Sequence, residues 1–114
     1  MTSRRAISQA EVRRIALALP EAFESAHFDR PDFRVGNKIF ATLRRERRAV
    51  IVKCDPADVA ALVLADGETF WNEWHGRWLG VRLDLVSRRI LRELLEDAWR
   101  LVAPRRLADT LRGG

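Results

Sequence analysis

Short apolar runs separated by polar and turn-forming residues in the middle of the chain predict three short strands. Two of them, 33–35 and 38–43, are rich in β-branched and aromatic residues. They are separated by Gly36-Asn37, a dipeptide that suits a two-residue hairpin turn. The third strand spans residues 48–53. The sequence therefore predicts two consecutive antiparallel hairpins.

The register of the first hairpin follows from its turn. A two-residue turn would set Val35 opposite Lys38 and Phe33 opposite Phe40. Both faces of the hairpin would then carry apolar side chains. One face is expected to pack on helices, and the other to be half covered or to form a contact surface.

Apolar residues at helical spacing predict three helices. The first spans residues 9–19 and begins with a capping box formed by Ser8 and Glu11. The second spans about 56–65, and the third, which has the widest apolar face, spans about 87–102. The third is expected to be the helix on which the sheet rests.

The rest of the chain is predicted to add extended segments. Residues 21–28 alternate weakly and suit an edge strand, while 70–74 and 78–83 suit a hairpin whose tip is 75–77. A short turn is expected at 105–111. The predicted order is one helix, three or four strands, a helix, two strands and a helix. This order indicates an α+β fold in two layers, with an antiparallel sheet carrying its helices on one face.

Length and composition indicate one soluble domain over residues 1–114, with flexible ends at 1–7 and 112–114. The 114 residues are 47% hydrophobic and 32% charged, and the single cysteine excludes an internal disulfide. No secretory or membrane segment is evident, so a cytoplasmic protein without a membrane partner is expected. We expect a monomer or a weak homodimer.

The charge of the chain is strongly positive and comes almost entirely from arginine. The formal net charge is +5, and Lys38 and Lys53 are the only lysines. Arginine pairs bidentately with phosphate, so this balance favours polyanions. A genome rich in G and C would also replace lysine by arginine without any nucleic-acid role.

The sharpest functional signal is the run Arg44-Arg45-Glu46-Arg47-Arg48 between the second and third strands. Its charge density predicts an exposed basic hairpin tip, because burying it would be very costly. We predict that these arginines contact nucleic acid, mainly the phosphates of DNA and without strong sequence preference. The predicted nucleic-acid-binding residues are Arg34, Lys38, Arg44, Arg45, Arg47, Arg48, Arg77 and Arg82.

Other reactive side chains do not form a recognisable centre. Cys54 is expected to be a buried thiol, and His27, His75 and Cys54 lack the spacing of a closed metal site. His27 is predicted to organise a loop by hydrogen bonding. We therefore predict no metal, no cofactor and no enzymatic activity. The residues that could organise a loop or bind a ligand are His27, Arg30, Trp74 and His75.

Aromatic and acidic residues leave two further expectations. Trp78 and Trp99 are predicted to be core residues, whereas Trp71 and Trp74, which flank basic residues, could either pack or stack on bases. An iron-binding role would require an acidic ridge. It is disfavoured because the acidic residues are dispersed among arginines in the sequence, at Asp55, Asp58, Glu93 and Asp97.

Several segments together resemble the MmcQ/YjbR-like family over nearly the whole chain. They are Ala16-Leu17-Ala18-Leu19-Pro20-Glu21, Glu24-Ser25-Ala26-His27-Phe28, Arg30-Pro31, Phe33-Arg34-Val35, Lys38-Ile39-Phe40-Ala41, Trp78-Leu79-Gly80-Val81-Arg82-Leu83-Asp84 and the segment 91–104. The resemblance implies a two-layer fold like that of frataxin homologues and type III secretion chaperones. It also implies DNA binding through a double wing of hairpins, and it brings no catalytic residues. Residues 69–76 are shorter than the loop that the family commonly has there, so a small second wing is expected.

Two alternatives to DNA binding stay open at this point. The chain could be a protein-interaction or chaperone-like module that uses the partly apolar second face of the sheet. It could also bind a small ligand near His27.

Overall fold

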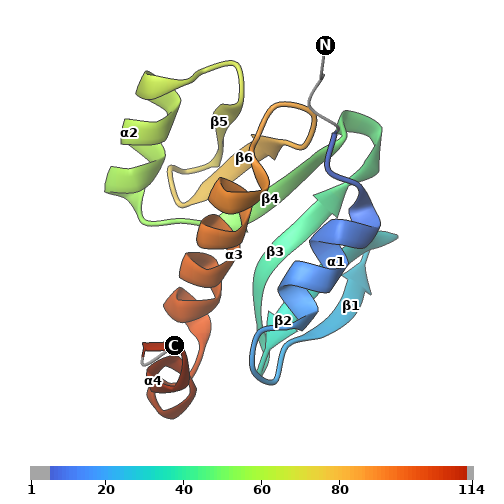
Figure 1. Ribbon diagram of the computed structural model, residues 1–114, viewed down its shortest axis with the longest axis vertical. Coiled ribbons are helices and arrows are strands. Elements are labelled where there is room, and N and C mark those ends of the chain that lie inside the picture. The colour runs from blue at the N-terminus through green and yellow to red at the C-terminus, as the bar shows by residue number, and fades with distance from the viewer. Residues whose placement is uncertain (1–5, 113–114) are drawn as a thin grey trace.

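The computed structural model describes residues 6–112 and shows an α+β fold of two layers (Figure 1). Six strands form one antiparallel sheet in the order β1-β2-β3-β4-β6-β5. The elements are α1 (Gln9–Leu17), β1 (Phe23–His27), β2 (Arg30–Val35), β3 (Lys38–Arg44), a 3₁₀ turn η1 (Arg45–Arg47), β4 (Ala49–Lys53), α2 (Pro56–Ala65), β5 (Phe70–Trp74), β6 (Trp78–Arg82), α3 (Arg88–Val102) and α4 (Arg105–Arg112). The predicted fold class is confirmed, and the element order is as predicted up to α3.

Several element boundaries differ from the predictions. The first helix ends at Leu17 rather than residue 19, and β2 begins at Arg30, so the turn before it is tighter than expected. The segment after Pro104 is a full helix, α4, rather than a single turn. Ile7, placed in a flexible end by the sequence, is buried and donates its N–H to Leu83 O at 2.9 Å. The flexibility expected of residues 1–5 and 113–114 lies outside the described residues.

The first hairpin has the predicted turn but a different register. Val35 pairs with Lys38 as expected, whereas Phe33 pairs with Ala41 rather than with Phe40. The register shifts between Phe33 and Arg34, so β3 carries one extra residue there. This irregularity lets Phe40 and Ala41, which are adjacent in sequence, both join the core.

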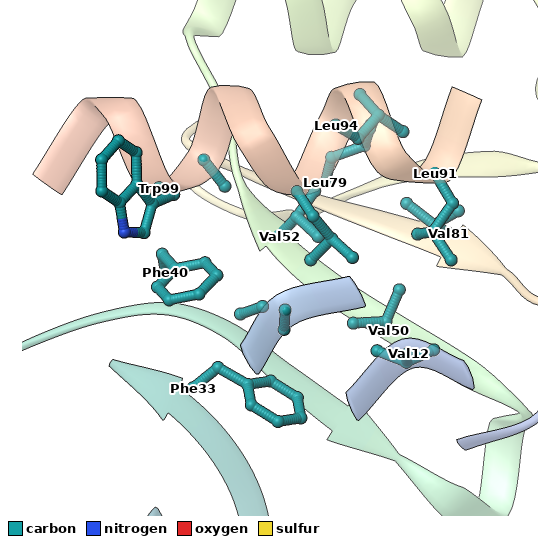
Figure 2. Packing of buried hydrophobic residues seen from close by; sticks show 14 of the residues in the cluster. Val12, Phe33, Phe40, Val50, Val52, Leu79, Val81, Leu91, Leu94 and Trp99 are labelled. Atoms are coloured by element: carbon teal, nitrogen blue, oxygen red, sulfur yellow. The ribbon is translucent and has the colours of Figure 1, made fainter. Parts of the chain in front are cut away.

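The core lies on one face of the sheet, because alternate residues of the central strands all point there. Val50 pairs with Leu43 and Val81, and all three belong to one buried cluster with residues of the helices. Figure 2 shows Trp99 of α3 above Phe40, with Val12 of α1 beside Val50. In Figure 1, α1 and α3 lie in front of the sheet. The prediction that Trp99 is a core residue is confirmed, since it is fully buried.

The opposite side of the sheet, here called the uncovered face, presents the other set of alternate residues. In the central strands these are Thr42, Ile51 and Gly80, which follow one another across β3, β4 and β6. Trp71 of β5 lies directly on Gly80, where an added Cβ would come within 2.0 Å of the indole. The sheet therefore covers part of this face with its own long side chains.

No helix among residues 6–112 has both the length and the apolar character that a membrane span requires.

Candidate nucleic-acid interface

The strand registers separate the predicted binding residues into two groups at opposite ends of the sheet. Arg44 pairs with Ala49, and Ala49 pairs with Arg82, so the β3–β4 turn and the end of β6 lie at the same end. Lys53 pairs with Trp78 at the other end, where β5 and β6 are joined. We call the end with Arg44, the β3–β4 turn and Arg82 the arginine end of the sheet.

The arginine end also contains the turn between β1 and β2. Asp32 pairs with Thr42, and β2 runs antiparallel to β3, so Arg30 lies toward the Arg44 end of β3. Two neighbouring hairpins thus project their turns from the same end. In Figure 1 both turns lie on the right of the molecule. The second turn at this end is therefore 28–29, whereas the family resemblance had placed the second wing in residues 69–76.

The β3–β4 turn exposes three arginine side chains on a well-defined backbone. Arg45–Arg47 form the 3₁₀ turn, and Arg48 closes it with a left-handed conformation (φ 49°), donating its N–H to Arg45 O at 3.1 Å. Leu83 N donates to Arg48 O at 2.9 Å and ties the turn to the segment after β6. Within residues 6–112, none of the guanidinium groups of Arg45, Arg47 and Arg48 forms an ion pair. The prediction of an exposed basic tip is correct for these three.

The prediction is wrong for Arg44, which is the last residue of β3 and is only 7% exposed. Its side chain lies on the uncovered face, where Nη2 donates to Glu73 Oε2 at 2.8 Å. The guanidinium carbon lies 5.2 Å from the centre of the Trp74 ring. Glu73 also accepts from Trp71 Nε1 at 2.6 Å. Because the strand alternation turns Arg44 onto the sheet, this arginine contributes to packing rather than to the basic tip.

Two other predicted residues are held by carboxylates. Arg82 donates to both oxygens of Asp84, at 3.1 and 2.7 Å, and this pairing lowers the pKa of Asp84. Arg34 donates to both oxygens of Asp32, at 2.8 and 3.0 Å. Each guanidinium already uses its Nε and Nη2 to hold a carboxylate, so its charge is partly neutralised and fewer donors remain for phosphate.

The remaining predicted residues lie at the other end of the sheet. Lys38 follows the β2–β3 turn, and Arg77 lies in the β5–β6 turn; both are exposed. His75 is exposed in the latter turn with φ 51°. Trp78 was predicted to be a core residue, and this is wrong. It lies half-buried on the uncovered face, edge-on to Trp74 at 5.7 Å.

His27, predicted to organise a loop, contacts Asp32 across the β1–β2 hairpin. Its Nδ1 lies 2.8 Å from Oδ2 of Asp32, which is fully buried. Burial acts to raise the pKa of Asp32, but the hydrogen bonds from Arg34 and His27 outweigh it and hold the pKa below its ordinary value. None of the cavities described in this structure is lined by His27. The geometry thus favours a structural role over a ligand pocket.

Sequence reasoning missed Glu73, Asp32 and Phe28. Glu73 and Asp32 hold the predicted cations Arg44 and Arg34, and Phe28 is the most exposed large apolar residue at this end. The even spacing of Arg30, Asp32 and Arg34 was a usable signal, because residues two apart in a strand share a face. No comparable signal links Arg44 to Glu73, which are separated by 29 positions.

The acidic residues that are dispersed in the sequence come together in the structure. Asp55 and Asp58 of the α2 start and Glu93 and Asp97 of α3 line one groove of about 580 Å³ beside Cys54. Burial, followed by Asp58 and Asp55, raises the pKa of the Cys54 thiol to about 11, which favours the protonated thiol at neutral pH. Among residues 6–112 no cluster of His, Cys, Asp and Glu has the closeness needed to hold a metal ion.

Comparison with known proteins gives a family and a fold. The model of the YjbR family matches residues 17–101. The crystal structure of a Deinococcus radiodurans protein with a DUF419 domain superposes with a TM-score of 0.75 at 23% identity, covering 91% of this chain and 84% of that chain. A Pseudomonas syringae protein gives 0.70 at 16% identity, covering 83% and 98%. No protein with curated function matches. At these identities the two structures support the fold alone.

Proposed function

The chain belongs to the YjbR family, and from that premise and the exposed arginines of the β3–β4 turn we propose that it binds the phosphate backbone of DNA. The contacting groups are Arg45, Arg47 and Arg48. Arg30 at the neighbouring β1–β2 turn is a fourth cation at the same end. The function is that of a binding protein rather than an enzyme.

The observation that carries the proposal is the difference between these arginines and their neighbours. Arg34, Arg44 and Arg82 each hold a carboxylate at 2.7–2.8 Å, whereas the three turn arginines hold none within the described residues. An exposed guanidinium without a carboxylate retains its full capacity for bidentate pairing with phosphate. The sheet supplies a rigid base from which these flexible side chains reach a duplex.

The same geometry favours backbone contact over base reading. The three side chains extend from a tight turn of three residues rather than from a helix that could lie along the major groove. Binding is therefore expected to be largely independent of sequence and strongly dependent on salt.

A salt titration tests this proposal. Fluorescence anisotropy of a labelled duplex would be followed for the unmodified protein and for the triple variant Arg45→Gln, Arg47→Gln and Arg48→Gln. Each phosphate contact contributes about 0.9 to the slope of log K against log salt, so the slope should fall by about 2 to 3. The fold should survive, because surface substitutions usually change stability by less than about 0.5 kcal/mol.

A second triple variant controls for net charge. Lys38→Gln, Arg77→Gln and Arg105→Gln remove the same three charges from exposed positions away from the arginine end. This variant should retain most of the slope. An equal loss in both variants would show binding through net charge rather than through the turn. Failure of the unmodified protein to bind a duplex at low salt would end the proposal.

A further inference from the structure

The β1–β2 turn contains a phenylalanine, Phe28, in a backbone conformation that is unfavourable for this residue type. Phe28 and Asp29 form this turn with φ values of 49° and 65°. Gly, Asn and Asp adopt such conformations readily, whereas a bulky residue is strained there. Phe28 is also 94% exposed, so its ring gains almost nothing from packing. Neither the turn nor the core explains a phenylalanine at this position.

The Phe28 ring nevertheless contacts the side chain of His27. His27 meets it edge-on, with ring centres 6.1 Å apart and planes at 77°. His27 is fixed in turn by Asp32 at 2.8 Å, and Asp32 is fully buried and held by two hydrogen bonds from Arg34. This chain of contacts connects the exposed ring to the interior of the sheet.

Arginines outnumber carboxylates around Phe28, although Asp29 shares its turn and Glu46 lies in the neighbouring turn. Arg30 begins the next strand, and no ion pair engages it in the described part of the chain. Across β2 and β3, the turn with Arg45, Arg47 and Arg48 projects from the same end of the sheet. An aromatic face interleaved with guanidinium groups is the arrangement that binds unpaired bases, since the rings stack and the cations pair with phosphates.

We propose that Phe28 stacks on an unpaired base of a bound polynucleotide, so that the arginine end binds single strands through base stacking in addition to phosphate contacts. This inference rests on the proposed function, because the β3–β4 turn would supply the phosphate contacts. The His27–Asp32–Arg34 chain would position the ring without touching the nucleic acid.

The test uses two probes of equal length and three variants. One probe is a single strand containing 2-aminopurine, whose fluorescence reports stacking, and the other is a labelled duplex. Phe28→Asn removes the ring and places a favoured residue in the turn, so the melting temperature should not fall. Single-strand affinity should drop by roughly fivefold or more, as expected for the loss of one base–aromatic stack, while duplex affinity should remain. Phe28→Trp should retain the single-strand affinity.

Leu64→Asn is the matched control, because Leu64 is an equally isolated apolar side chain, 89% exposed on α2. It should change neither affinity. If Phe28→Asn keeps the single-strand affinity and the 2-aminopurine signal, the inference fails while duplex binding leaves the proposed function intact. If the unmodified protein binds neither probe at low salt, both fail. Binding to phosphatidylserine vesicles that requires Phe28, without binding of either probe, would instead identify the turn as a membrane contact and overturn the inference.

Discussion

On the helix-covered face of the sheet, the interior is filled by apolar side chains such as Trp99, Phe33 and Leu95, all fully buried. On the uncovered face, Asp32, Thr42 and Arg44 are buried to nearly the same extent, at 0, 2 and 7% exposure. The first group is stabilised by apolar area removed from water. The second group tolerates burial because each polar side chain has a hydrogen-bond partner: Arg34 for Asp32, Pro31 O for Thr42 and Glu73 for Nη2 of Arg44. Arg44 Nε, by contrast, is buried without a partner among the described residues.

This comparison separates two uses of arginine that the sequence presents as one run. Arg44 and Arg45 are adjacent, yet the first is buried on the sheet and the second is exposed in the turn. Strand arginines should therefore determine stability, and turn arginines should determine binding. Substitutions on the two faces test this distinction between stability and binding.

The largest effect is expected on the helix-covered face. Trp99→Ala would leave a large cavity and remove the hydrogen bond from Trp99 Nε1 to Pro20 O at 3.0 Å. We expect a loss of about 4 kcal/mol in the free energy of unfolding, measured by urea denaturation. Leu101→Ala is the control, because Leu101 lies on the same helix and is 49% exposed. A Trp99→Ala protein of unchanged stability would contradict the assignment of the core.

A somewhat smaller effect is expected from the ion pair on the uncovered face. Arg44→Met would leave Glu73 with only the Trp71 indole as a partner in a site that is 11% exposed. Breaking such a pair from one side costs about 3 kcal/mol. Arg44→Met combined with Glu73→Gln should recover part of this loss, because no unpaired charge remains.

That recovery is the outcome to examine in a double-mutant cycle. Strict additivity of the two substitutions would show that Arg44 and Glu73 do not interact energetically. Duplex binding should be unaffected in all three proteins, since Arg44 is not part of the exposed turn. If Arg44→Met lost duplex binding without a change in fold, Arg44 would have to be counted among the DNA-contacting residues.

The sequence predicted the elements well because their signals are local. The capping box at Ser8 and the positive φ of Gly36 follow from neighbouring residues, and both are present in the structure. The partners of buried charges could not be predicted in this way. The contact between Glu73 and Arg44 depends on the order of the strands in the sheet, in which β6 and β4 lie between β5 and β3. This order cannot be derived from neighbouring residues in the sequence. The extra residue at Phe40 could not be predicted either, because the rules for hairpin turns consider only neighbouring residues, whereas Phe40 packs in the core with residues of the helices.

The smallest of the expected effects depends on pH. The pKa of Asp32 is lowered on folding, so its carboxylate contributes stability above its ordinary pKa of 3.8. That contribution is lost as the pH falls below about 4 and through the lower pKa of the folded state. Asp32→Asn should therefore cost about 1 to 2 kcal/mol at neutral pH, where hydrogen bonds to a charged group are lost. The difference from the unmodified protein should shrink in acid.

Urea unfolding of both proteins at pH 7, 5, 4 and 3 would measure this difference directly. Asp29→Asn is the control, because Asp29 is exposed in the β1–β2 turn and asparagine accepts its φ of 65°. A gap that stays constant from pH 7 to 3 would mean that Asp32 acts by shape rather than by charge. If the difference in the free energy of unfolding disappears in acid, the stabilisation by Asp32 comes from its paired charge. Trp99→Ala should show no such disappearance, because its loss comes from cavity and contact area, which protons do not alter.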